Sequence, residues 1–268
     1  MSIDNMDKIF RPESIAVVGA SERKGSVGAA LMHNLIERGF AGEIHPINPN
    51  HKKIFQLPAC PSVKDLTTPV DLAVIATPIL SAPLIVKECA DAGVGGVVII
   101  SAGGKEIGKQ GQQLEAAIKK EAAKSGMRII GPNCLGIVSS RWKLNASFAG
   151  QMPIAGKMAF LSQSGAVCSA ILDLSIQENI GFSYFASLGS MLDVEFGDMI
   201  DYLGGQPEVS SIVMYVESIL DALSKFHECR PGGFARQTDY CLEGRALTCR
   251  VPRSRLSHRC TGRRRHGL

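Results

Sequence analysis

The stretch SIAVVGASERKGSVG, residues 14–28, decides the fold of this chain. Its apolar run Ile15–Val18 predicts a buried strand, and a segment with helical spacing of apolar residues follows from Val27. The glycines between them allow a tight turn and let backbone N–H groups approach an anion at the start of the helix. Because the pattern is not a strict GxGxxG, it indicates a nucleotide-like ligand and leaves a plain strand-to-helix turn as the alternative.

The same alternation of short strands and helices continues along the chain, which is typical of a parallel sheet covered on both faces. In the first unit we expect strands at Ser14–Val18, Glu43–Ile47, Asp71–Ile75, Gly96–Ile100 and Arg128–Ile130, and helices at Val27–Arg38, Ser81–Ala92 and Gln110–Lys124. Gly39, Gly93 and Gly126 follow the three helices, where a glycine with positive φ commonly ends a helix. The fold class is therefore α/β, beginning with a Rossmann-like domain over residues 1–138.

A second unit starts after a polar connection, Ser139–Pro153. Its expected elements, in chain order, are Lys157–Leu161 (strand), Gly165–Glu178 (helix), Gly181–Ala186 (strand), Phe196–Leu203 (helix) and Ser211–Tyr215 (strand). The composition changes soon afterwards. We therefore expect a second, flavodoxin-like domain over residues 152–226 that is cut off at about its third strand.

Residues 227–268 differ in composition from everything before them. They contain ten arginines, four of the eight cysteines and three acids, but no lysine or isoleucine. Their charge of +7 exceeds the +4 of the whole chain and leaves about −3 for residues 1–226. An Arg-rich arm that binds nucleic acid is one interpretation, but we expect a disordered tail and no nucleic-acid partner. The cysteine spacings lack a CxxC pair, which argues against a zinc element.

The first 226 residues exclude several classes of protein. No apolar run approaches the roughly 18 residues that span a bilayer, so we expect no membrane segment. The first eleven residues contain acids and no long apolar stretch, which argues against a secretory signal. The cysteines in this part of the chain, Cys60, Cys89, Cys134 and Cys168, lie far apart without metal-ligand spacing. These features predict reduced thiols, a cytoplasmic location and no metal site.

Two lysines follow the second expected strand. An NAD-binding fold places an acid there to hold the ribose hydroxyls, whereas this chain has Asn48, Pro49 and then Lys52 and Lys53. A phosphorylated ribose fits better, which leaves NADP or coenzyme A (CoA) as the ligand. An ordinary solvated lysine pair is the alternative.

Three further loops follow strands and therefore meet at the carboxyl edge of the sheet, where open α/β folds bind ligands. They are Ala76–Pro78, Ser101–Lys105 and Gly131–Gly136. Cys134 lies in the last of them, but no histidine is placed by the sequence to activate it. We expect a small buried thiol beside a ligand rather than a nucleophile.

The second unit repeats the anion-binding pattern. Ser162, Ser164 and Gly165 lie between a strand and a helix, and hydroxyls with glycine at a helix start suit a phosphate. Glu217 ends an apolar strand and so points to the same edge, although a solvated loop acid is the alternative. The segment Ser187–Asp198 is rich in acids that could contribute to the site, and helix capping by Asp193 with Glu195 and Asp198 solvated is the alternative.

Together these loops resemble the NDP-forming acyl-CoA synthetases, the superfamily of succinyl-CoA synthetase and ADP-forming acetate–CoA ligase. The resemblance covers about residues 7–226. It is carried, in order, by SIAVVGASERKGSVG, IHPINPNHKKI, VIATP, ISAGGKE, GPNCLGI, FLSQSGAV, SLGSMLDVEFGDMIDYL and VMYVESI. It implies a CoA-binding domain followed by a succinyl-CoA-ligase-like flavodoxin domain. The implied reaction converts acyl-CoA, phosphate and ADP into acid, CoA and ATP through acyl phosphate and phosphohistidine.

The resemblance also implies roles for individual residues. By analogy, the CoA site is lined by Gly19, Ser21, Lys24, Ser26, Val27, Pro49, Lys52, Thr77 and Asn133. Ser162, Ser164 and Gly165 would hold the phosphate of the phosphohistidine, and Glu217 would orient that histidine. ADP or ATP and Mg²⁺ would be bound by ATP-grasp domains of the family, which implies an ATP-grasp subunit or domain as a partner.

The chain departs from the family at the phosphorylated histidine, which lies in a Ser-His-Thr-Gly-Ala motif that is absent here. With freely chosen GC-rich codons, Arg255–Cys260 read one base later gives Ala-Ser-His-Thr-Gly-Ala, and the stretch from His227 gives family-like words. We therefore interpret residues 227–268 as an out-of-frame tail after a one-base insertion near Phe226. Sequencing the locus tests this.

The sequence thus predicts the CoA-binding and partial ligase region of an ADP-forming acyl-CoA synthetase, inactive by itself. A non-catalytic CoA or nucleotide sensor, such as the sensing half of a protein lysine acetyltransferase, is the alternative. An NADP oxidoreductase is a third hypothesis, which the missing Tyr-Lys or His constellation disfavours.

Overall fold

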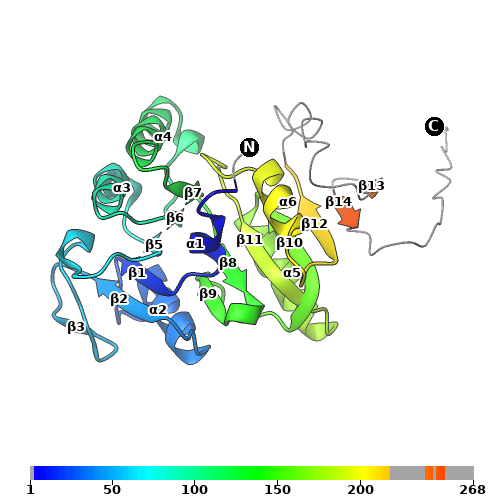
Figure 1. Cartoon of the computed structure of the whole chain (residues 1–268), viewed down its shortest axis with the longest axis horizontal. Helices are drawn as coiled ribbons and strands as arrows, with labels where there is room; N and C mark the ends of the chain where they lie inside the picture. Colours follow the sequence, from blue (N-terminus) through cyan, green and yellow to red (C-terminus); the bar gives the residue numbers. More distant parts are fainter. Residues whose placement is uncertain (1–2, 218–238, 244–245, 251–268) are drawn as a thin grey trace.

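The computed structural model describes residues 3–217, 239–243 and 246–250. Two α/β units stand side by side (Figure 1). The first contains a five-stranded parallel sheet in the order β2-β1-β5-β6-β7. Its strands are β1 (Ser14–Val18), β2 (Glu43–Ile47), β5 (Leu72–Ile75), β6 (Gly96–Ile99) and β7 (Arg128–Ile130). The inner strands β5 and β6 are buried at every position, as their apolar sequences require.

Helices cover both faces of this sheet and confirm the doubly wound class. α2 (Val27–Glu37) packs in one apolar cluster with α1 (Met6–Phe10), whereas α3 (Ala82–Asp91) and α4 (Lys109–Ala122) share a second cluster. The residues after the three long helices, Gly39, Gly93 and Gly126, have φ of 73°, 76° and 68°, as predicted for helix ends. The remaining short elements are β3 (Lys53–Ile54), β4 (Leu57–Pro58) and the 3-10 turns Val63–Asp65, Ile79–Ser81, Lys105–Ile107 and Ser140–Trp142.

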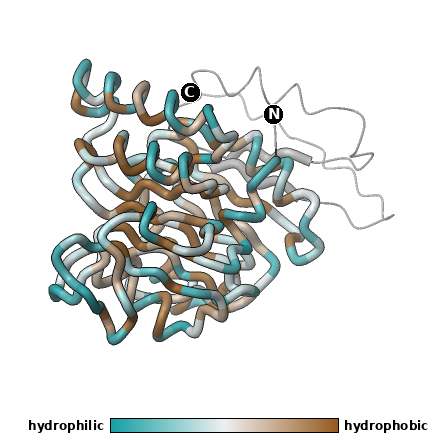
Figure 2. Tube along the Cα trace, turned by 60° about the vertical axis from the view of Figure 1, so that its left-hand side comes forward, coloured by the Kyte–Doolittle hydropathy of each residue, from teal (hydrophilic) through white to brown (hydrophobic). Residues whose placement is uncertain are grey.

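The second unit contains a seven-stranded mixed sheet in the order β13-β14-β12-β10-β11-β8-β9, counted over the described residues. Its parallel centre is β10 (Ala155–Ser162), β11 (Phe182–Ser187) and β12 (Ser211–Tyr215), with helices α5 (Gly165–Gln177) and α6 (Phe196–Gly204). These elements lie within a few residues of their predicted positions. Figure 2 shows hydrophobic segments running through the interior and hydrophilic ones along the outer turns.

Part of the segment expected to be a polar connection is instead a hairpin in the second sheet. β8 (Gly136–Ser139) pairs antiparallel with β11, and β9 (Leu144–Ser147) pairs antiparallel with β8. All four residues of β9 are buried, and the polar ones are satisfied because Ser147 Oγ donates to Asn145 Oδ1 at 2.6 Å. The predicted boundary after residue 138 therefore falls inside β8.

Two described segments lie in the tail that we expected to be disordered. β13 (Asp239–Glu243) and β14 (Ala246–Arg250) form an antiparallel pair, and β14 pairs with β12. For these ten residues the structure corrects the prediction of disorder, because the edge of β12 offers unpaired backbone groups for a further strand. The rest of residues 227–268, including His258, lies outside the described residues.

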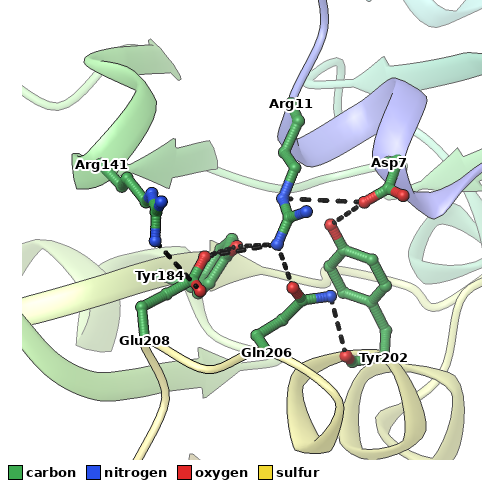
Figure 3. A network of polar contacts seen from close by, with 7 residues as sticks. All are labelled: Asp7, Arg11, Arg141, Tyr184, Tyr202, Gln206 and Glu208. Atoms are coloured by element: carbon green, nitrogen blue, oxygen red, sulfur yellow. Dashed lines mark hydrogen bonds and ion pairs between the residues drawn. The ribbon is translucent and has the colours of Figure 1, made fainter.

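A polar network fastens the N-terminal helix α1 to the second unit (Figure 3). The Arg11 guanidinium lies 3.4 Å from Glu208 Oε1, which accepts a hydrogen bond from Tyr184 Oη at 2.7 Å. Tyr202 Oη donates to Asp7 Oδ1 at 2.7 Å. Burial, reinforced by the hydrogen bond to Glu208, raises the pKa of Tyr184 to about 12, so this phenol stays protonated as a donor at neutral pH.

The apolar core is also continuous between the units. Phe10 of α1 packs edge-on against Tyr184 and stacks on Tyr202, with ring centroids 5.8 and 5.5 Å apart. One cluster of buried side chains runs from β1 through Phe10 to α6. The relative placement of the two sheets is therefore fixed by packing, and the loops at their edges face a common space.

Across the described ranges, 3–217 with the two strands of the tail, we find no helix with the length and apolarity needed to cross a membrane.

Candidate functional site

A cavity of about 1060 Å³ lies between the two units. Its wall combines the turn after β1, the ends of β5 and β6, the segment after β7 and the start of α5. The lining residues are Gly19, Ser21, Arg23, Gly25, Ser26, Val27, Gly28, Ala76, Thr77, Pro78, Ile100, Ser101, Ala102, Asn133, Cys134, Leu135, Phe148, Gln163, Ser164, Gly165, Ala166, Ser169 and Glu217. The two turns in which the sequence indicated anion binding thus open into one cavity.

The turn after β1 is shaped by glycines. Gly19 has φ +88°, and a Cβ there would lie 2.9 Å from Thr77 Cγ2. A Cβ on Gly28 would lie 2.0 Å from the Gly19 carbonyl oxygen, so only glycine lets α2 begin this close to the turn. The start of α2 is therefore held at the cavity wall with its backbone N–H groups available to an anion.

Hydroxyl groups fix this turn and its neighbour. Ser26 caps α2 by accepting a hydrogen bond from Ala29 N at 3.2 Å, and Ser21 Oγ accepts one from Arg23 N at 3.0 Å. Ser101 Oγ donates to the Thr77 carbonyl, which ties the end of β6 to the end of β5. Gly19, Ser21, Ser26, Val27 and Thr77, all predicted for the site, line the cavity.

Three residues predicted for the CoA site are not in the cavity wall. Lys24, Pro49 and Lys52 are exposed in the loops that follow β1 and β2. A residue that sequence reasoning missed connects these loops, because Asn48 Nδ2 donates to the Ala20 carbonyl at 2.8 Å. A polar residue directly after a strand was the available signal, but its contact depends on the fold.

The segment after β7 brings Asn133 and Cys134 into the wall, as expected. Asn133 has φ 57°, a left-handed conformation that asparagine tolerates better than most residues. Cys134 Sγ donates to the Ile99 carbonyl at 3.2 Å, and burial raises the pKa of this thiol to about 12. A thiol with such a pKa is protonated at neutral pH, so the structure gives Cys134 a packing role and not a nucleophilic one.

The start of α5 forms the opposite wall. Ser164 caps the helix by accepting from Val167 N at 3.3 Å, and a Cβ on Gly165 would lie 3.6 Å from Leu135 N. Ser162 is fully buried and outside the wall, and its hydroxyl accepts from Ser164 N at 2.9 Å. Ser164 and Gly165 therefore face the cavity, whereas Ser162 holds the turn behind them.

Glu217 lies in the same wall, and sequence reasoning missed the residue that holds it. The Gln163 side chain accepts a hydrogen bond from Glu217 N at 2.6 Å through Oε1. Gln163 N also donates to the Tyr215 carbonyl at 3.3 Å, so the turn before α5 and the end of β12 are joined twice. The backbone of Glu217 is thereby held beside the turn that precedes α5, and its exposed side chain lines the cavity.

Acids of the segment Ser187–Asp198 support the fold and lie outside the cavity wall. Asp193 accepts from Arg128 Nε at 2.8 Å and from Ile129 N at 2.9 Å. Asp198 accepts from Glu195 N at 3.1 Å and caps α6 together with Glu195. Burial raises the pKa of Asp198. The structure corrects the capping interpretation: Glu195 and not Asp193 stands at the start of α6, and Asp198 is buried and not solvated.

Comparison with known proteins identifies both units. Residues 13–140 match the CoA binding domain family, and residues 155–230 match the succinyl-CoA ligase like flavodoxin domain. The chain therefore consists, over these residues, of a CoA binding domain followed by a succinyl-CoA ligase like flavodoxin domain.

The relatives that this chain matches are longer. An acetate–CoA ligase (ADP-forming) of Methanocaldococcus jannaschii is 43% identical over 213 residues, which cover 80% of this chain and 30% of the relative. The alpha subunit of acetate–CoA ligase (ADP-forming) II of Pyrococcus furiosus is 41% identical, with 81% of this chain and 47% of that subunit covered. The chain therefore spans less than half the length of these two relatives.

A solved structure agrees with the fold of both units. The acetyl-coenzyme A synthetase 1 of Ca. Korarchaeum cryptofilum, in complex with phosphate and ADP, superposes with a TM-score of 0.81 at 35% identity. The match covers 85% of this chain and 48% of that one.

Proposed function

We propose that this chain binds CoA in the cavity between its two units and forms the CoA-binding part of an ADP-forming acyl-CoA synthetase. The observation that carries the proposal is that one cavity joins the starts of α2 and α5 with Glu217. CoA carries phosphates at one end and a thiol at the other. It therefore suits a cavity in which one anion-binding turn takes the CoA phosphates and the second, at the start of α5, takes the phosphate that reacts at the thioester.

The first unit would hold the nucleotide end of CoA. The turn Gly19–Gly28 supplies backbone N–H groups for its diphosphate, assisted by the hydroxyls of Ser21 and Ser26. Thr77 and Asn133 line the path of the pantetheine arm toward the second unit. Lys24, Pro49 and Lys52 would contact the adenosine and its phosphate at the outer surface, where the two ammonium groups are exposed.

The second unit would hold the transferred phosphate. Phosphate attacks the thioester carbon of acyl-CoA, which gives acyl phosphate and releases the CoA thiol. The start of α5, with Ser164 and Gly165, stabilises the phosphoryl charge. In the family reaction the phosphoryl group then moves to a histidine, releasing the acid, and Glu217 would orient that histidine. The ordered Gln163–Glu217 contact supports this role.

Further parts of the reaction would come from outside the described residues. We propose that an ATP-grasp domain or subunit binds ADP and Mg²⁺ and takes the phosphoryl group to form ATP. The phosphorylated histidine is proposed to be encoded in the +1 frame at Arg255–Cys260. This chain alone would then bind CoA without turning it over, and sequencing the locus tests the shifted frame.

Calorimetric titration of CoA into the purified chain tests the proposal. We expect saturable heat with CoA and markedly weaker heat with NADP, because the cavity continues to the start of α5 and can take the pantetheine arm. Gly19→Val should abolish the heat, since a side chain would fill the turn at a positive φ. Absence of heat at millimolar CoA, or equal heat with NADP, would contradict the proposal.

A further inference from the structure

Phe148 is a large apolar side chain that the fold leaves open to the cavity. It is 40% exposed, and it lines the cavity. Most other aromatic rings of the second unit are buried in the core, including Phe160, Phe182 and Phe185. A ring that lines a cavity without being covered offers apolar surface to a ligand.

The backbone on both sides of Phe148 is fixed from the first unit. The buried Asn34 amide, on α2, donates to the carbonyls of Ser147 and Ala149 at 2.8 and 2.7 Å. Ala149 N donates to Ser147 Oγ at 3.3 Å. Because the carbonyls before and after it are bonded to one side chain, the exposure of Phe148 is a property of an ordered segment.

Phe148 lies beside the proposed phosphate site. Its backbone N–H donates to the Leu135 carbonyl at 3.2 Å. Leu135 in turn is next to the start of α5, since a Cβ on Gly165 would lie 3.7 Å from Leu135 Cβ. In the proposed reaction the acyl carbonyl must reach a phosphate at this helix start, so its substituent extends along Leu135 and Phe148.

The charges of the cavity favour an uncharged substituent there. Within the part of the chain that the structure describes, the charged residues in the wall are Arg23, in the turn after β1, and Glu217, beside α5. A free carboxylate on the acyl group, as in succinyl-CoA, would therefore lie near Glu217 and the Phe148 ring and not near a cation. Burying such a charge without a partner is costly.

We propose that Phe148 is a specificity-determining residue that forms the apolar wall of the acyl pocket, against which an uncharged acyl group packs. This inference rests on the proposed function, because it places the thioester of acyl-CoA between the two units. The inference places Phe148 against the acyl group, so we expect its substitution to change the ratio between acyl-CoA and CoA binding.

The test compares dissociation constants of CoA, acetyl-CoA, phenylacetyl-CoA and succinyl-CoA for the full chain and for Phe148→Ala. We expect the chain to bind phenylacetyl-CoA about tenfold more tightly than CoA, because the acyl group buries apolar area on the ring. Succinyl-CoA should gain nothing over CoA. In Phe148→Ala the preference for phenylacetyl-CoA over CoA should fall to about twofold.

Controls separate the possible outcomes. Ile154→Ala removes an apolar side chain of equal exposure, 41%, outside the cavity wall and should leave every ratio unchanged. Phe148→Leu should retain part of the preference, and thermal unfolding shows whether each variant is folded. A phenylacetyl-CoA to CoA ratio that Phe148→Ala leaves unchanged would overturn the inference while CoA binding stands. Failure of the unsubstituted chain to bind CoA would overturn the proposed function together with the inference.

Discussion

Two strand-to-helix turns line the same cavity but are built in different ways. The turn ahead of α2 depends on glycine, because Gly19 has a positive φ and Gly28 lies against the Gly19 carbonyl. The turn ahead of α5 depends on serine, because Ser162 accepts from Ser164 N and Ser164 caps the helix. Its glycine, Gly165, has space around it. The conformation of the first turn thus depends on close backbone packing, and that of the second depends on hydrogen bonds. We therefore expect added side-chain volume to destabilise the first turn more than the second.

The largest effect is expected for Gly28→Ala. The added Cβ would lie 2.0 Å from the Gly19 carbonyl oxygen, so either α2 or the turn must move. Overpacking of this kind should lower the free energy of unfolding by about 3 kcal/mol, which urea denaturation measures. An unchanged urea midpoint, compared with the unsubstituted chain, would show that the close approach of Gly28 to the Gly19 carbonyl does not require glycine.

A middle-sized effect is expected for Ser164→Ala. It removes the hydroxyl that accepts from Val167 N, and loss of such a cap costs about 1 kcal/mol of unfolding free energy. Ser26→Ala, the matched change at α2, should cost a similar amount. A clearly smaller loss at Ser164 than at Ser26 would contradict the dependence of the second turn on serine.

A smaller effect is expected for Lys52→Ala, in the loop after β2. An exposed lysine that contacts the ribose phosphate should weaken CoA binding about threefold and leave binding of 3′-dephospho-CoA unchanged. Lys120→Ala, an exposed lysine on α4, serves as the control. If Lys52→Ala weakened the binding of CoA and of 3′-dephospho-CoA equally, Lys52 would not contact the ribose phosphate.

The smallest effect is expected for Gly165→Ala. The new Cβ would make only ordinary contacts, 3.6 Å from Leu135 N, and the residue begins a helix. Restricting the unfolded chain should raise the free energy of unfolding by about 0.5 kcal/mol in the same urea experiment. If Gly165→Ala lowered the free energy of unfolding as much as Gly28→Ala, the two turns would not differ in the way described.

The elements around these turns could be predicted because local sequence determines them. The strand Ser14–Val18 and the starts of α2 and α5 lie where the apolar run, the glycines and the capping serines indicate. β9 could not be predicted in this way, since Asn145 and Ser147 make its sequence polar and the burial comes from the packing of α2. Buried polar residues that pair with each other give a polar sequence pattern, which is indistinguishable from that of a surface loop.

The motifs name several residues of the cavity wall, whereas Lys24, Pro49, Lys52 and Ser162 lie outside it and the cavity itself could not be predicted. Gly19, Ser26, Thr77, Asn133, Ser164 and Glu217 all line it, as the motifs indicate. Two contacts that complete the site join distant residues: Gln163 and Glu217, within the second unit, are 54 positions apart, and Asn34 and Ala149, which connect the two units, are 115 positions apart. No local pattern encodes such pairs. The contact of Asn34 with the segment around Phe148 depends in addition on the placement of the two sheets, to which α1 and the network around Arg11 contribute.

The central claim is that CoA spans both turns of one cavity. Amide hydrogen exchange of the full chain, with and without saturating CoA, tests it directly, because the first N–H groups of α2 and α5 lack helical partners and exchange readily. We predict slower exchange on CoA binding both at residues 19–29 and at residues 164–168. Slower exchange confined to residues 19–29, with the start of α5 unchanged, would contradict the claim.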